Sequence, residues 1–171
     1  NRLRQLLKFS DIPLSPTAEV LLFNASRAQL VNDIIKPSLE QGFVVLSDRF
    51  TDSTLAYQGY GRGIPLEKVE TVNSAATDGL KPSLVVFLDI SPEEGLRRRP
   101  TTRDRFEGGP EQKEVMDFHG RVRDGYLKMA GEDPDRWLVV DARLPQREVS
   151  RLIWRRVEPM LNKVTIAPEG P

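Results

Sequence analysis

The residues best suited to chemistry lie in one stretch, "VVLSDRFTDSTLAYQGYGRG" at positions 44–63. An apolar run ends there in Asp48 and Arg49, and hydroxyl and amide side chains follow. A carboxylate at the end of a buried strand is typical of a site that holds Mg²⁺ near nucleotide phosphates, directly or through water. A neighbouring guanidinium can position phosphate oxygens and neutralise their charge. The pair therefore indicates phosphoryl-transfer chemistry.

Arginines occur at other positions where they could also bind phosphate. Arg27 lies on the helix predicted before this stretch, and Arg62 follows its glycines. One polar segment is crowded with Arg97, Arg98, Arg99, Arg103 and Arg105. Gly, Pro and Thr residues in that segment favour a mobile flap that closes over phosphates. The alternative is a solvated surface, where most arginines lie without a ligand.

Phe23 and Arg27 are spaced i, i+4 and therefore share one helix face. An aromatic ring and a guanidinium one turn apart can recognise a nucleobase, by stacking and by a bond to a carbonyl. Phe23 could equally be an ordinary core residue. The spacing leaves both interpretations open.

Composition excludes several classes of function. The 171 residues favour one domain, and the formal net charge of +0 argues against broad nucleic-acid binding. No apolar run approaches membrane-spanning length. The chain has no cysteine, which fits a reducing cytoplasm and excludes thiolate metal sites. With His119 as the single histidine, the chain has almost no material for a Ser-His-Asp triad.

Apolar strands alternate with helical patterns along the chain, which predicts a three-layer α/β fold with a mostly parallel sheet. In such sheets ligands bind beyond the carboxyl ends of the strands, where Asp48, Asp89 and Asp141 would lie. Asp89 and Asp141 could instead cap the turns that follow them. The predicted strands are 43–47, 84–90 and 137–142, and the predicted helices are 15–42, 65–79, 91–99, 111–130 and 144–164.

Several motifs, in this order, resemble those of bacterial thymidylate kinases: "LLFNASRAQLV", "DRFTDSTLAYQGYGRG", "PSLVVFLDISPEEGLRR", "DRFE" and "FHGRVRDGYLKMA". The resemblance extends to about Ile153. It implies a phosphate-loop kinase fold in a single domain, 1–171. The implied reaction transfers the γ-phosphoryl group of ATP to thymidine monophosphate, with Mg²⁺, and gives thymidine diphosphate.

The resemblance also implies roles for individual residues. Phe23 would stack on thymine, and Arg27 would bond its carbonyl edge. Arg49 would hold the monophosphate, and Asp48 would organise magnesium-bound water. The sugar and base would be lined by Ser53, Thr54, Tyr57, Gln58 and Tyr126, with Tyr57 placed to disfavour a ribose 2′-hydroxyl.

Segment 97–110 resembles the lid that closes over ATP, with Arg98, Arg103 and Arg105 as equal candidates for the contact. The tail 164–171 is predicted to be frayed. Apolar helix faces and the resemblance suggest a cytoplasmic homodimer.

The sequence departs from the family pattern at one motif. A phosphate loop reads G-x-x-x-x-G-K-[ST], yet no Gly here is followed by Lys. We expect the natural protein to carry a further strand, loop and helix of roughly thirty or more residues. The spacing around Arg99 and Pro100 also differs from the family pattern, so residues could be absent there. A non-catalytic nucleotide-binding or dimerisation protein and a related deoxynucleoside kinase are the alternative functions.

Overall fold

The computed structural model describes residues 14–98 and 112–161. Its elements in chain order are α2 (Pro16–Leu30), η1 (Val31–Ile35), α3 (Lys36–Glu40), α4 (Thr51–Thr54), η2 (Leu55–Gly61), α5 (Leu66–Thr77), β1 (Val85–Asp89), α6 (Pro92–Arg97), α7 (Gln112–Glu132), β2 (Trp137–Asp141) and α8 (Gln146–Leu161). The segments η1 and η2 are π-helical turns. The predicted tail 164–171 and most of the predicted lid lie outside the described residues.

Local sequence signals set the limits of the long helical segment, as predicted. The Ser15 hydroxyl accepts a hydrogen bond from the Ala18 N–H at 3.2 Å and caps α2. The helix continues through the wider η1 turn into α3, where Pro37 occupies the first turn. It ends at Gly42, whose φ of 81° is the left-handed conformation that glycine adopts without strain.

The strand predicted at 43–47 is wrong. The segment runs irregularly from α3 to Asp48 and pairs with no strand among the described residues. Its apolar side chains are exposed, with Phe43 at 62%, Val44 at 55% and Leu46 at 90%. An apolar run becomes a buried strand only when neighbouring strands and a covering layer accept it.

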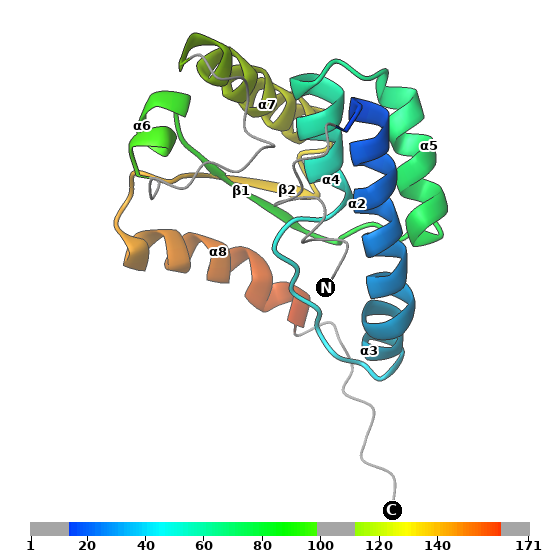
Figure 1. The fold of residues 1–171 in the computed structure, drawn as a ribbon. Coiled ribbons are helices and arrows are strands. Elements are labelled where there is room, and N and C mark those ends of the chain that lie inside the picture. Colours follow the sequence, from blue (N-terminus) through cyan, green and yellow to red (C-terminus); the bar gives the residue numbers. More distant parts are fainter. Residues whose placement is uncertain (1–13, 99–111, 162–171) are drawn as a thin grey trace, which may run out of the picture.

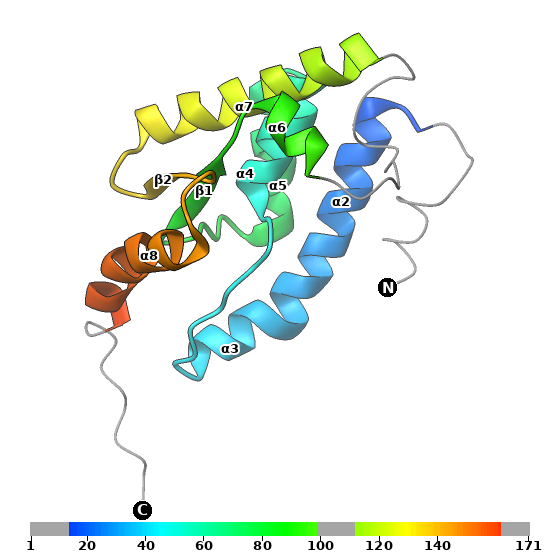
Figure 2. The same ribbon diagram turned by 90° about the vertical axis from the view of Figure 1, so that its left-hand side faces the viewer.

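The other two predicted strands are confirmed. β1 and β2 pair in parallel, with Val85 opposite Trp137 and Asp89 opposite Asp141. Both aspartates therefore lie at the same edge of the sheet. In Figures 1 and 2 the sheet lies between α7 on one side and α8 on the other, which gives the helix–sheet–helix layering predicted from the sequence.

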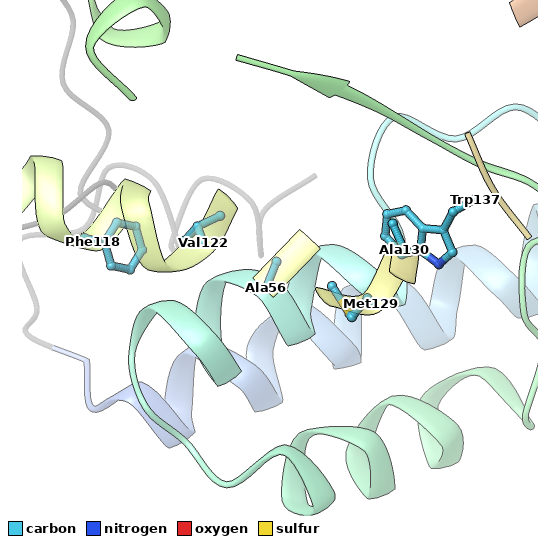
Figure 3. Packing of buried hydrophobic residues seen from close by; sticks show 6 residues of the cluster. All are labelled: Ala56, Phe118, Val122, Met129, Ala130 and Trp137. Carbon is cyan, nitrogen blue, oxygen red and sulfur yellow. The ribbon is translucent and has the colours of Figure 1, made fainter. Parts of the chain in front are cut away.

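The main core lies between η2, α7 and the start of β2. Phe118, Val122 and Met129 of α7 line up along one helix face and pack with Ala56 of η2 and Trp137 of β2 (Figure 3). Burial of this apolar area is the dominant favourable term in folding. Helix α7 thereby becomes the rigid support of η2, the element that carries the predicted site residues Tyr57 and Gln58.

Glycine makes the close approach of η2 and α7 possible. A Cβ atom added to Gly125 of α7 would lie 2.5 Å from the Tyr60 ring. The Arg121 side chain of α7 donates two hydrogen bonds to the Gly61 carbonyl, at 3.1 and 3.0 Å. Packing and hydrogen bonding therefore fix the orientation of η2 on α7.

Candidate active site

Arg49 and Tyr57 form the centre of the candidate site. The Arg49 guanidinium lies 4.6 Å from the centroid of the Tyr57 ring, and its Nη2 donates to the Tyr57 hydroxyl at 3.1 Å. This is the only hydrogen bond of the Arg49 side chain within the described ranges. Desolvation against Tyr57 acts to lower the pKa of Arg49, but Tyr57, Tyr126 and Asp48 outweigh it and raise the pKa. The group is therefore a permanent cation whose remaining N–H groups can receive an anion.

The backbone at Arg49 is strained. Its φ of 71° lies in the left-handed region, which costs a residue with a Cβ about 1–3 kcal/mol. The Ser47 hydroxyl donates to the Arg49 carbonyl at 2.9 Å and stabilises this turn. Strain of this kind concentrates where a side chain must be aimed at a ligand. Here it directs the guanidinium onto Tyr57.

Tyr126 connects α7 to α4 next to this pair. Its hydroxyl donates to Ser53 Oγ at 2.8 Å, and its ring stacks on Phe87 with centroids 4.7 Å apart. Burial raises the pKa of Tyr126 to about 12, while the bond to Ser53 acts in the opposite direction. The phenol is therefore neutral and remains a hydrogen-bond donor at physiological pH.

Arg27 is bound almost entirely by the protein itself. Nη1 donates to Asn24 Oδ1 at 2.9 Å and to Asn73 Oδ1 at 3.3 Å. Nη2 donates to the Phe50 carbonyl at 3.1 Å and to Thr54 Oγ1 at 2.9 Å. Four of the five guanidinium N–H groups are thus occupied, and Nε alone keeps its N–H without a hydrogen bond among the described residues. Burial lowers the pKa of Arg27 to about 10, with Asp52 acting against it, so the group stays charged at neutral pH.

The structure brings several predicted substrate residues into direct contact. Arg49 contacts Tyr57, Tyr126 contacts Ser53, and Arg27 contacts Thr54. Phe23 lies half-buried on α2, one turn before Arg27. Gln58 is 3% exposed in η2 and directly follows Tyr57 in the chain.

The two aspartates at the sheet edge are neutralised by arginines. Arg123 of α7 donates to both carboxylate oxygens of Asp89, at 2.6 and 2.8 Å. Asp141 accepts hydrogen bonds from the Arg143 backbone and guanidinium, which lower the pKa of Asp141 to about 2. Asp141 thus caps the turn that follows it, which is one of the two interpretations that its position in the sequence allows.

The predicted ATP-contacting arginines are only partly described. Arg98 donates to Glu94 and, at 2.9 Å, to the Ala142 carbonyl at the end of β2. It is therefore anchored beside the sheet edge. Arg103 and Arg105, the rest of the predicted lid and the spacing around Arg99 and Pro100 lie outside the described residues.

Asp48 is exposed beside Arg49, and the residues at this point fit a weakly held Mg²⁺ ion. No group of three or more potential ligands occurs in the described part of the chain. Mg²⁺ commonly binds through one or two carboxylates together with substrate phosphates and water. A single exposed carboxylate suits that arrangement and does not suit a metal cage made by the protein alone.

Four residues that hold the candidate site residues in place were not predicted from the sequence. Asn24 and Asn73 are buried and fix Arg27, and a buried Asp52 accepts from Arg136 Nη1 at 3.0 Å. Asparagine in a helix interior is unfavourable because its side chain competes for backbone hydrogen bonds. That cost was the available signal for Asn24 and Asn73. Nothing in the local sequence links Asp52 to Arg136, 84 residues away.

Comparison with known proteins gives this site its context. A family model described as thymidylate kinase matches residues 1–153. The chain belongs to the thymidylate kinase family. A thymidylate kinase of Synechococcus sp. strain JA-2-3B'a(2-13) is 47% identical over 167 residues, which cover 98% of this chain and 78% of the relative. One from Dehalococcoides mccartyi strain ATCC BAA-2266 / KCTC 15142 / 195 is 45% identical over 163 residues, covering 94% of this chain and 76% of the relative.

A solved structure supports the same family. The crystal structure of thymidylate kinase from Ehrlichia chaffeensis superposes with a TM-score of 0.68 at 33% identity, covering 89% of this chain and 71% of that one. The α/β class predicted from the sequence is thereby confirmed. Within the described residues, no helix is both long and apolar enough to cross a membrane.

Proposed function

We propose that the protein transfers the γ-phosphoryl group of ATP to thymidine monophosphate and so forms thymidine diphosphate. Its membership of the thymidylate kinase family carries this conclusion. Side chains from α2, α4, η2 and α7, together with Arg49 before α4, supply the base-binding and phosphate-binding groups of this proposal. We name this set the acceptor cluster: Arg27, Arg49, Ser53, Thr54, Tyr57 and Tyr126.

Arg49 is the residue to which we assign the acceptor phosphate. Its guanidinium is held on one side by Tyr57 and keeps N–H groups for phosphate oxygens. Phosphoryl transfer depends mainly on positioning and on neutralising charge on oxygens. A charged fork already aimed by a strained backbone meets both needs without reorganisation at the moment of reaction.

Base recognition falls to Phe23 and Arg27. The Phe23 ring, one turn from Arg27, would stack on thymine. Because the four Nη hydrogens of Arg27 are occupied, Nε is the donor left for a base carbonyl. A guanidinium held this firmly loses little entropy on binding, which increases affinity for a correctly shaped base.

The sugar would lie between the two tyrosines. Tyr57 would stand against the position of a ribose 2′-hydroxyl, and Tyr126 would approach the sugar or phosphate from α7. Thr54 and Ser53 hold Arg27 and Tyr126 by hydrogen bonds. We assign Gln58, next to Tyr57 in η2, to the lining of the base and sugar pocket as well.

ATP and Mg²⁺ complete the proposed reaction. Mg²⁺, when bound, neutralises charge on the phosphates, and Asp48 would hold it through water. Arg98 is held at the sheet edge by Glu94 and Ala142, and Arg103 and Arg105 stay candidates for the ATP contact. We further assign the protein to the cytoplasm, where ATP and a cysteine-free chain are both expected.

A homodimer is proposed from an apolar surface on one helical segment. Leu21, Leu30, Ile34 and Leu39 of α2, η1 and α3 are all exposed. Exposed apolar residues concentrated on one segment commonly mark a protein interface. Light scattering of the full-length protein is expected to give twice the chain mass, and Ile34→Glu should shift it towards the monomer. A monomeric wild-type protein would exclude the dimer.

One assay tests the proposed function against its alternatives. The full-length protein is incubated with ATP and Mg²⁺ and with either thymidine or its monophosphate, and product formation is followed. Thymidine diphosphate should form from the monophosphate, and thymidine should not be phosphorylated. Phosphorylation of thymidine would indicate a deoxynucleoside kinase, whereas binding of the monophosphate without turnover would indicate a non-catalytic binding protein.

A further inference from the structure

Asn73 is a buried polar residue of α5 that touches two other elements. It is 4% exposed. Its Nδ2 donates to the Thr51 carbonyl at 3.1 Å, and its Oδ1 accepts from Arg27 Nη1 at 3.3 Å. One short amide thus links α5 to α2 and to the first residue of α4.

The partners of Arg27 differ in how they are themselves held. Asn24 donates from Nδ2 to the Val20 carbonyl of its own helix, so its position is fixed by α2 alone. The Phe50 carbonyl lies just before α4, and the Thr54 hydroxyl comes from its last residue. Asn73 is the only partner of Arg27 from α5 among the residues that the structure describes.

This arrangement gives Asn73 control over both the guanidinium and its surroundings. A guanidinium bonded on both Nη atoms has a fixed plane, and the direction of Nε follows from it. Because Asn73 also bonds Thr51, it sets the spacing between Arg27 and the residues of α4 that contact it. An amide can donate to one group and accept from another at the same time, which the two contacts of Asn73 require.

We propose that Asn73 is a positioning residue for the acceptor site and acts through Arg27 on the affinity for thymidine monophosphate. The inference rests on the proposed role of Arg27 in base recognition. It goes beyond that role because Asn73 is not assigned to the substrate and lies on α5, which contributes no residue to the acceptor cluster.

A double-mutant cycle with Asn73→Ala and Arg27→Ala tests the inference. Calorimetric titration of the full-length protein with thymidine monophosphate measures the Kd without any need for ATP. Asn73→Ala should raise the Kd about tenfold in the wild-type background and less than twofold in the Arg27→Ala background. Asn73→Asp keeps an acceptor for Arg27 but loses the donor to the Thr51 carbonyl, so its Kd should lie between those of wild type and Asn73→Ala. Asn32→Ala, which removes an exposed amide on η1, is the matched control and should leave the Kd unchanged.

The outcomes separate this inference from the proposed function. An unchanged Kd in Arg27→Ala would overturn both the role of Arg27 and the inference. A weakened Arg27→Ala with an unaffected Asn73→Ala would overturn the inference alone. An equal Kd increase in both backgrounds would also overturn it, because Asn73 would then act independently of Arg27. Should Asn73→Ala lose its fold by circular dichroism, Asn73→Ser, whose shorter side chain gives up both contacts, carries the same cycle.

Discussion

Arg27 and Arg49 lie in two regions that treat the same side chain in opposite ways. Among the described residues, Arg27 donates four hydrogen bonds, to side chains of α2, α4 and α5 and to the Phe50 carbonyl before α4. In the same part of the chain the Arg49 side chain makes one, next to an aromatic ring and on a strained backbone. The first guanidinium is a fixed part of the interior, and the second is aimed but still open. The difference indicates that the proposed base-binding side of the acceptor site is fixed before a ligand binds. On the proposed phosphate-binding side, the Arg49 guanidinium keeps N–H groups for a ligand.

The largest effect is expected at the open arginine. Arg49→Ala should lower kcat by two or more orders of magnitude, since a donor to transferring oxygens is lost. The melting temperature should hardly change, because the side chain makes a single hydrogen bond to the part of the chain that the structure describes. Steady-state kinetics and thermal unfolding check the two parts. Arg151 is an exposed arginine on α8, and Arg151→Ala serves as the control. A similar fall in kcat in Arg151→Ala would show that the effect is not specific to Arg49.

The next effect concerns the interior that carries α4. Asp52→Ala breaks the buried pair with Arg136 and should lower the free energy of unfolding by about 2 kcal/mol, after discounting for the partial exposure of Arg136. Denaturant unfolding measures it. Asp133→Ala removes the more exposed partner of the same arginine and should destabilise the fold less than Asp52→Ala does. An equal loss of unfolding free energy in Asp52→Ala and Asp133→Ala would show that burial does not make the Asp52 contact the stronger of the two.

A smaller effect is expected inside the Arg27 network. Thr54→Val keeps the side-chain volume but removes the hydroxyl that accepts from Arg27 at 2.9 Å. The loss should lower the free energy of unfolding by about 1.5 kcal/mol, because a charged donor loses one partner. Thr71→Val, whose exposed hydroxyl bonds its own helix, should stay within about 0.5 kcal/mol of wild type. An unchanged free energy of unfolding in Thr54→Val would mean that the hydrogen bond from Arg27 to Thr54 does not stabilise the fold.

The smallest effect near neutral pH involves Tyr126. Because burial raises the pKa of Tyr126 to about 12, it ionises later in the folded than in the unfolded state. Its contribution to stability is therefore complete below the ordinary tyrosine pKa of about 10 and is lost as the pH rises towards 12. Absorbance titration should show one late-ionising tyrosine, absent in Tyr126→Phe. A titration unchanged by the substitution would contradict the burial of this phenol.

Much of the fold followed from local signals in the sequence. Ser15 and Ser91 cap their helices as expected, and the strands at 85–89 and 137–141 form where apolar runs were found. The run at 43–47 has the same composition but no pairing partner among the described residues, so its apolar character alone did not decide its structure. Strand formation depends on neighbours that a single segment does not contain.

Part of the candidate site could also be predicted from the sequence, and part of it could not. The residue types of Arg49, Ser53 and Tyr57 indicated phosphate and sugar chemistry because they occur together in sequence. The network around Arg27 could not be predicted, since Asn73 lies 46 residues from Arg27 in the sequence. Hydrogen bonds between distant segments depend on packing, which sequence spacing does not report.

The contrast between the two arginines can be measured in a single titration series. Calorimetry compares thymidine monophosphate with thymidine, two ligands that differ only in the phosphate, on wild-type protein and on Arg49→Ala. Wild type should bind the monophosphate at least a hundredfold more tightly, and Arg49→Ala should reduce that preference to a few-fold. A preference for the monophosphate that survives intact in Arg49→Ala would contradict the assignment of the phosphate to Arg49.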